Sequence, residues 1–226
     1  MKKLFLTLVF IEYMSISITH AQIKQMSIGI NAGPSLVLIY GSELMKIGHS
    51  EPSFGYSIGL SFDLNIKTTF AIKTGITFER KGQIIPNCTL TDKNGQELGY
   101  GNVTENNYYL DIPLMISKSF GNKVIFFINI GAYGGFLVKS DVMLKKPKKI
   151  KVDNTDGIRK IDIGFILGLG VSIPLGQKFG LSFELRDNLG IASLYVDGPF
   201  IGNHTIKNNV TTILVGFAYK ILRNKH

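Results

Sequence analysis

Large apolar residues and small polar residues alternate along most of this chain. In residues 54–65 every second position, from Phe54 to Leu64, is large and apolar, while the positions between carry Gly, Ser, Asp or Asn. A period of two is that of a β-strand whose two faces meet different surroundings. The pattern recurs at 70–79 and 161–170. After the amino-terminal segment no run approaches the roughly 18 uninterrupted apolar residues of a membrane helix, so helical spans are excluded.

Weaker alternation raises the number of predicted strands to eight. The weaker segments are 26–35, 108–119, 124–138, 179–188 and 208–221. All eight are long enough for the roughly 9 to 11 residues of a tilted membrane strand. Long connections at 36–53, 82–106, 139–157 and 189–207 alternate with short ones at 66–69, 121–122 and 174–178. Long extracellular loops and short periplasmic turns are typical of outer-membrane barrels. The sequence therefore predicts an all-β fold, an eight-stranded antiparallel up-and-down transmembrane β-barrel.

The polar face of the predicted strands indicates which side meets lipid. It is dominated by Gly, Ser and Asn, which suit a crowded lumen better than a water-facing surface, where glycine only weakens a strand. Eight strands leave room for side chains and not for an aqueous pore. Buried charges need partners, and this face carries both signs. We therefore expect a lumen charge network that plugs the barrel, made of Asp63, Lys73, Glu79, Asp111, Lys160, Asp162, Glu184 and Arg186. A soluble periplasmic barrel with the apolar set inside, around an apolar ligand, is the alternative.

The first residues are typical of a cleaved signal peptide. Lys2 and Lys3 precede an apolar run, and cleavage is expected between Ala21 and Gln22. This divides the chain into a signal peptide, 1–21, and a barrel domain, 22–226. The formal net charge is +9, but export excludes nucleic acid as the partner of this basic chain. We expect the outer membrane of a Gram-negative cell, where Cys88, the only cysteine, closes no internal disulfide.

Several short motifs on successive predicted strands resemble one family. They are Gly29-Ile30-Asn31-Ala32-Gly33, Gly75-Ile76-Thr77-Phe78-Glu79-Arg80-Lys81-Gly82, Tyr109-Leu110-Asp111-Ile112-Pro113, Gly131-Ala132-Tyr133, Asp162-Ile163-Gly164, Gly168-Leu169-Gly170 and Leu185-Arg186-Asp187-Asn188-Leu189-Gly190. Their order resembles the PorT-type outer-membrane β-barrel family, which is similar in architecture to the OmpA and OmpX barrels. The resemblance implies the fold. The family takes its name from a protein involved in secretion, but the resemblance does not carry a secretion partner over to this chain.

The third long connection holds the best candidate for binding. It carries the basic residues Lys145, Lys146, Lys148, Lys149 and Lys151. On an extracellular loop these could contact lipopolysaccharide phosphates or an acidic polymer through salt-sensitive contacts. A purely solvated charged loop is the plain alternative. We expect a structural or extracellular-binding role through the long loops, with outer-membrane lipid around the barrel.

Enzyme chemistry has little support in the sequence. An enzyme that modifies lipid at the barrel rim would need a nucleophile, a base and an orienting group. His49 beside Ser50 and His204 beside Thr205 are the candidate bases, but neighbours on a loop do not make a catalytic dyad. No metal-ligand spacing or nucleotide-binding loop is present. We expect no catalytic residues, no metal and no cofactor.

Overall fold

The computed structural model describes residues 25–41, 51–91, 94–144, 149–195 and 206–222. These residues form nine strands and one short 3₁₀ helix, η1, at Thr155–Gly157. The strands are β1 Gln25–Tyr40, β2 Ser53–Lys67, β3 Phe70–Thr91, β4 Glu97–Phe120, β5 Ile125–Leu144, β6 Ile150–Asp153, β7 Ile161–Leu175, β8 Phe179–Gly190 and β9 Lys207–Leu222. Every pairing between them is antiparallel.

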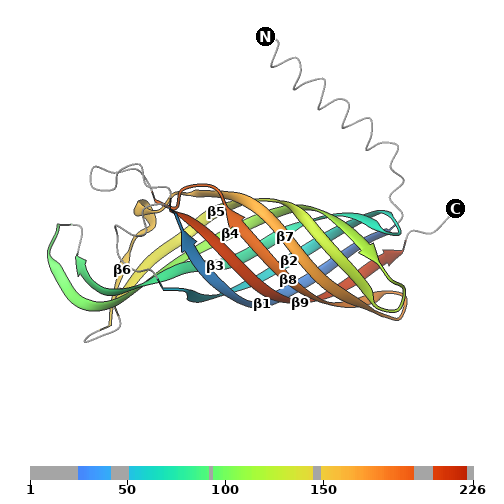
Figure 1. The fold of residues 1–226 in the computed structure, drawn as a ribbon, viewed down its shortest axis with the longest axis horizontal. Coiled ribbons are helices and arrows are strands. Elements are labelled where there is room, and N and C mark those ends of the chain that lie inside the picture. The colour runs from blue at the N-terminus through green and yellow to red at the C-terminus, as the bar shows by residue number, and fades with distance from the viewer. Residues whose placement is uncertain (1–24, 42–50, 92–93, 145–148, 196–205, 223–226) are drawn as a thin grey trace, which may run out of the picture.

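Eight of the strands close into a barrel (Figure 1). Neighbours in the ring follow the chain from β1 to β5 and from β7 to β9, and β5 pairs with β7. The first and last strands complete the ring, because β1 pairs with β9 from Gln25↔Leu222 to Tyr40↔Lys207. The short strand β6 stands outside the ring and pairs with the outer part of β5. The predicted eight-stranded up-and-down barrel is confirmed.

The two ends of the barrel differ in the length of their connections. At one end of the barrel, short turns join β2 to β3, β4 to β5 and β7 to β8. The first and last described residues, Gln25 and Leu222, lie at this same end (Figure 1). Gly121 and Gly176 begin two of these turns with φ of +102° and +68°, backbone angles that glycine adopts without steric cost. Short turns mark the periplasmic end of outer-membrane barrels. The opposite end, with the long connections, is therefore the extracellular end.

Two of the predicted long loops, at 82–106 and 139–157, consist in large part of strand. In the second, β5 continues to Leu144 and pairs with β6. The pairing of β3 with β4 continues past the barrel to Thr91↔Glu97 and includes Cys88↔Gly101, so the expected loop at 82–106 is a long hairpin (Figure 1). The sequence prediction ended the strand here because turn-forming residues are frequent in this segment. In the structure a register shift between Ile85 and Cys88 accommodates them within the strand, with Asn87 at a φ of +52°. A bulge of this kind lets a strand absorb an irregular residue without ending.

The apolar residues of the alternating pattern point outward. Phe54 is 79% exposed and Leu167 is 52% exposed, and the same holds for large apolar residues on every strand of the ring. A soluble barrel would bury these side chains, so the alternative of a periplasmic barrel with an apolar interior is wrong. Among the described residues no helix is long and apolar enough to span a membrane. An exception to the apolar exterior is Asp187, which accepts hydrogen bonds from Thr211 and Asn209 at 2.7 and 3.3 Å.

A charge placed on the middle of the exterior should be costly. Leu167→Arg is expected to lower the free energy of unfolding by about 2 to 4 kcal/mol, because an arginine at the bilayer midplane loses its hydration. The control is Asn122→Arg, which places the same charge on an exposed periplasmic turn. Folding titrations into lipid vesicles measure both. Equal tolerance of the two substitutions would show that Leu167 does not face lipid.

Candidate functional site

The lumen is organised around a buried lysine. Lys81, on β3, is 1% exposed, and its Nζ lies 2.9 Å from Asp111 Oδ2, 2.9 Å from Asp162 Oδ2 and 3.4 Å from Glu79 Oε2. The rings of Tyr109 and Tyr133 also lie close, with centroids 4.9 and 4.6 Å from the same nitrogen. We call these six residues the Lys81 cluster. Strands β3, β4, β5 and β7 contribute to it, so one cation holds together side chains from half of the ring.

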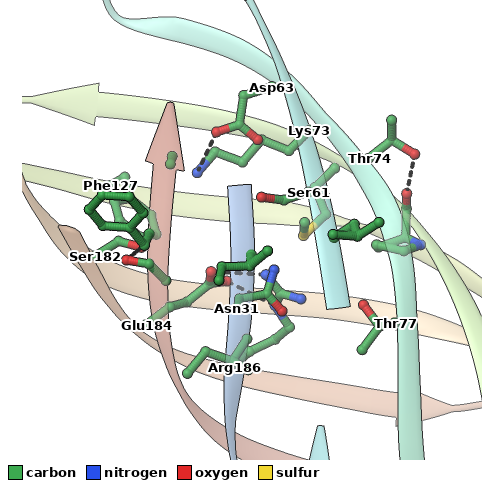
Figure 2. A pocket seen from close by; sticks show the side chains of 18 residues that line it. Asn31, Ser61, Asp63, Lys73, Thr74, Thr77, Phe127, Ser182, Glu184 and Arg186 are labelled. Carbon is green, nitrogen blue, oxygen red and sulfur yellow. Dashed lines mark hydrogen bonds and ion pairs between the residues drawn. The ribbon is translucent and has the colours of Figure 1, made fainter. Parts of the chain in front are cut away.

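A second group of charges lies in the periplasmic half of the lumen. Arg186 binds Glu184 through two parallel hydrogen bonds of 2.9 Å each, and Asn129 donates a third to Glu184 at 2.9 Å. Lys73 Nζ lies 3.9 Å from Asp63 Oδ2. The four charged side chains line a cavity of about 60 Å³, and Figure 2 shows the two charged pairs on opposite sides of it. The cavity has room for only a few water molecules.

Glycines make room for both groups of charges. A Cβ on Gly135 would collide with a carboxylate oxygen of Asp111, and one on Gly168 would collide with a carboxylate oxygen of Glu184. Both glycines face the lumen. The small residues on the polar face of the sequence pattern therefore leave space for the long charged side chains of neighbouring strands.

The structure places seven of the eight residues of the expected charge network in the lumen. The eighth, Lys160, is exposed in a bend just before β7, because the strand parity used to orient it does not extend past Ile161. Lys81 was missed and takes the central position. Continuing the alternation of Thr77 and Glu79 by one step would have placed it in the lumen.

The extracellular mouth is closed by residues from connections. Ile158, just before β7, and Leu194, just after β8, are buried against Tyr109. On β4, further toward the extracellular end than Tyr109, Glu105 is buried and accepts hydrogen bonds from Asn107 at 2.6 Å and Tyr195 at 2.9 Å. Burial raises the pKa of Glu105, and these hydrogen bonds oppose the rise. The lumen is therefore capped by an apolar layer that the sequence prediction of a polar plug did not include.

Of the five basic residues, the structure describes two, Lys149 just before β6 and Lys151 on β6. Lys145, Lys146 and Lys148 lie outside the described residues, as do the expected cleavage site at Ala21 and Gln22 and the two candidate bases His49 and His204. Lys149 and Lys151 are exposed. Lys151 Nζ lies 3.1 Å from Asp141 Oδ2, across the pair of strands.

The charged side chains of the lumen pair with one another inside the barrel. In the described part of the chain no group of three or more His, Cys, Asp or Glu side chains could hold a metal ion. The carboxylates of the Lys81 cluster lie within 3.4 Å of the lysine nitrogen, and two cavities in the lumen have volumes of about 60 and 10 Å³.

A closed ring of eight strands with an apolar exterior, a charged and packed interior and unequal ends defines a transmembrane β-barrel of the outer-membrane class. Residues 19–196, well over half of the chain, match the outer membrane protein beta-barrel domain family, and the chain belongs to that family. It is an outer-membrane protein. No curated protein sequence matches the chain significantly.

Several solved structures are similar over most of their length. OprG from Pseudomonas aeruginosa is 14% identical with a TM-score of 0.49, and the match covers 88% of this chain and 98% of OprG. Neisserial surface protein A is 12% identical with a TM-score of 0.48, covering 87% and 97%. Ail of Yersinia pestis is 11% identical with a TM-score of 0.44, covering 86% and 98%. These distant similarities concern the chain path and assign no function.

Removing the central cation should destabilise the barrel. Lys81→Met leaves three buried carboxylates without their lysine, and we expect a loss of about 3 to 5 kcal/mol in the free energy of unfolding. Lys160→Met, the same change at an exposed lysine, should have little effect. Unfolding in denaturant in the presence of lipid compares the two. Equal losses would contradict the central position of Lys81.

Two adjacent glycines provide a matched test of lumen packing. Gly135→Ala places a methyl group against Asp111 and should cost about 1 to 3 kcal/mol through overpacking. Gly134→Ala adds the same methyl group where nothing lies within 4 Å and should be tolerated. The same unfolding measurement applies. If Gly134→Ala is the more harmful of the two, the assignment of faces on β5 is wrong.

Proposed function

We propose that this protein is a non-enzymatic outer-membrane barrel that binds an acidic polymer outside the cell through the lysine-rich β5–β6 hairpin. The observation that carries the proposal is that the strands on this side do not end at the barrel rim. Strands β3, β4, β5 and β6 continue outward as one sheet, so that β6, which carries Lys151, lies outside the ring of eight strands (Figure 1).

The projecting sheet has a small core of its own, which supports a role as a platform. Val103 on β4 and Leu144 on β5 are buried, and Val142, Ile150 and Val152 pack against them. The strands on either side of residues 145–148 are thus anchored by apolar packing. An anchored loop loses less conformational entropy on binding than a free one, so its contacts contribute more to affinity.

The charge of the hairpin supports an anionic partner. Five lysines fall within residues 145–151, and Asp141 forms an ion pair with one of them, Lys151. Clustered lysines attract polyanions through long-range, salt-dependent interactions. A lipid phosphate is a weaker candidate for this hairpin, because the sheet carries it beyond the end of the apolar belt.

The other parts of the proposal rest on the sequence. We place the chain among the PorT-type members of the family on the motifs of its strands, and we take Ala21 as the last residue of a cleaved signal peptide. Absence of enzyme activity is proposed because the lumen carboxylates are held by lysine and arginine. A rim-active lipid-modifying enzyme remains the second candidate only through His49 and His204, which lie outside the described residues. A role in protein secretion has no structural observation in its favour.

The hairpin proposal can be tested with dextran sulfate as the probe. Substituting Lys145, Lys146, Lys148 and Lys149 by Gln together should weaken binding of the purified barrel by about tenfold or more, which corresponds to about 1.4 kcal/mol. The wild-type affinity should fall steeply with added salt. The control replaces Lys123 and Lys178, exposed lysines of the periplasmic turns, by Gln. If the control weakens binding as much as the hairpin variant, binding reflects net charge alone and the proposal is wrong.

The orientation required for this role can be tested with the single cysteine. Cys88 lies in the part of β3 that extends beyond the barrel. A thiol reagent too large and polar to cross the outer membrane should label it on intact cells, and Cys88→Ser should abolish the signal. Labelling of denatured protein controls for a thiol shielded by its own hairpin. A thiol that is accessible in the purified folded protein, but is labelled in cells only after permeabilisation, would reverse the orientation.

A further inference from the structure

The barrel exterior carries a row of alternating aromatic and cationic side chains at its extracellular boundary. Cross-strand pairing places Tyr56 on β2 opposite Arg80 on β3, Arg80 opposite Tyr108 on β4, and Tyr108 opposite Lys139 on β5. Directly paired residues share one face of a sheet. Tyr108 stacks on the ring of Phe78 at 6.0 Å, and Tyr56 lies 6.4 Å from that ring. We call Tyr56, Arg80, Tyr108 and Lys139 the boundary row.

Arg80 is held in place without being neutralised. Its Nε donates to Asn106 Oδ1 at 3.1 Å, and its Nη2 donates to the same oxygen. The amide nitrogen of Asn106 in turn donates to Asp141 at 2.9 Å, and Asp141 forms an ion pair with Lys151. Within the described part of the chain no carboxylate forms an ion pair with Arg80 or with the exposed Lys139. The boundary row therefore presents two positive charges that no carboxylate neutralises. The hydrogen bonds to Asn106 fix the direction of one of them, the Arg80 guanidinium.

An apolar groove lies next to the boundary row on its membrane side. It has a volume of about 650 Å³ and runs over the outward side chains of β9 and β1–β4, with Ala32 the smallest of those that line it. Phe78 and Leu110 belong to its lining. Arg80 and Tyr108 follow them two positions further out on their strands, roughly 7 Å at the rise of a β-strand. The groove thus ends close beneath the cations.

We propose that this flank of the barrel binds a phosphorylated lipid of the outer leaflet, with the phosphate between Arg80 and Lys139 and an acyl chain in the groove. Guanidinium and ammonium groups are the usual protein ligands of phosphate, and tyrosines at a bilayer boundary lie at the level of the headgroups. A free phosphate ion would make no use of the groove. The surface is separate from the lysine-rich hairpin and does not depend on polyanion binding there.

The test measures how much lipid the purified full-length barrel retains, by native mass spectrometry from detergent. The probe is a bisphosphorylated diglucosamine lipid, compared with the same lipid after removal of its phosphates. The combined substitutions Arg80→Gln and Lys139→Gln should weaken retention by about tenfold or more. The control combines Lys118→Gln and Lys123→Gln at the periplasmic end, where Lys118 lies over the ring of Phe70. The control should retain the lipid as the wild type does.

A second variant tests the groove without changing any charge. Ala32→Phe fills the groove from the lipid-exposed face, and it should reduce retention of the phosphorylated lipid although both cations remain. Arg80→Lys keeps the charge but loses the two hydrogen bonds to Asn106, so an intermediate loss is expected. Heat-dependent migration in gel electrophoresis confirms that each variant is folded. Because all variants retain Lys145–Lys151, binding of dextran sulfate should be unchanged, which separates this test from that of the hairpin.

Three results would overturn the proposal. The first is unchanged retention by the Arg80 and Lys139 variant, and the second is equal retention of the dephosphorylated lipid. The third is displacement of the lipid by inorganic phosphate together with normal retention by Ala32→Phe, which would indicate a plain anion site. Loss of retention in both the cation variant and the groove variant, with the periplasmic control unaffected, supports the lipid site.

Discussion

The closure of the sheet between β1 and β9 is the constraint on which the rest of the structure depends. Inside a bilayer there is no water to satisfy an unpaired backbone group, so a sheet can cross only as a closed ring. Here the ladder from Gln25↔Leu222 to Tyr40↔Lys207 joins the two ends of the chain. Once the ring is closed, each strand has one face toward lipid and one toward the lumen. The period of two in the sequence is the direct consequence.

Closure with eight strands also explains the interior. The ring is so narrow that side chains from strands on opposite sides of the lumen meet in its middle. The polar side chains that point into the lumen must therefore pair with one another. Lys81 meets carboxylates of three residues there, while Gly135 and Gly168 lack the side chains that would collide with the neighbouring charges. Charge pairing and glycine placement are thus two sides of one packing solution. Two cavities that this packing leaves among the described residues of the lumen have volumes of about 60 and 10 Å³.

Most of the barrel could be predicted from sequence, because alternation reports directly on a two-faced environment. The failures have local causes. Cys88 was placed in a loop because nearby turn-forming residues resemble a strand end, whereas a bulge carries β3 past them. Lys160 was placed in the lumen because the alternation of inward and outward side chains was extended to it. That alternation holds only within a paired strand, and Lys160 precedes β7. Ile158 and Leu194 cap the mouth from irregular segments, where no periodicity exists to reveal burial. The boundary row depends on register across four strands, which one sequence does not show.

Ring closure itself can be measured most directly by amide hydrogen exchange of the barrel in lipid bilayers. Amides of β1 and β9 bonded across their seam, between Ile28 and Ala32 and between Val215 and Tyr219, should exchange as slowly as amides of β3 and β4, which lie between two neighbours in any arrangement. Exposed amides in the turn at 121–124 supply the fast reference. Fast exchange confined to the β1–β9 seam would show an open sheet and would contradict the transmembrane barrel.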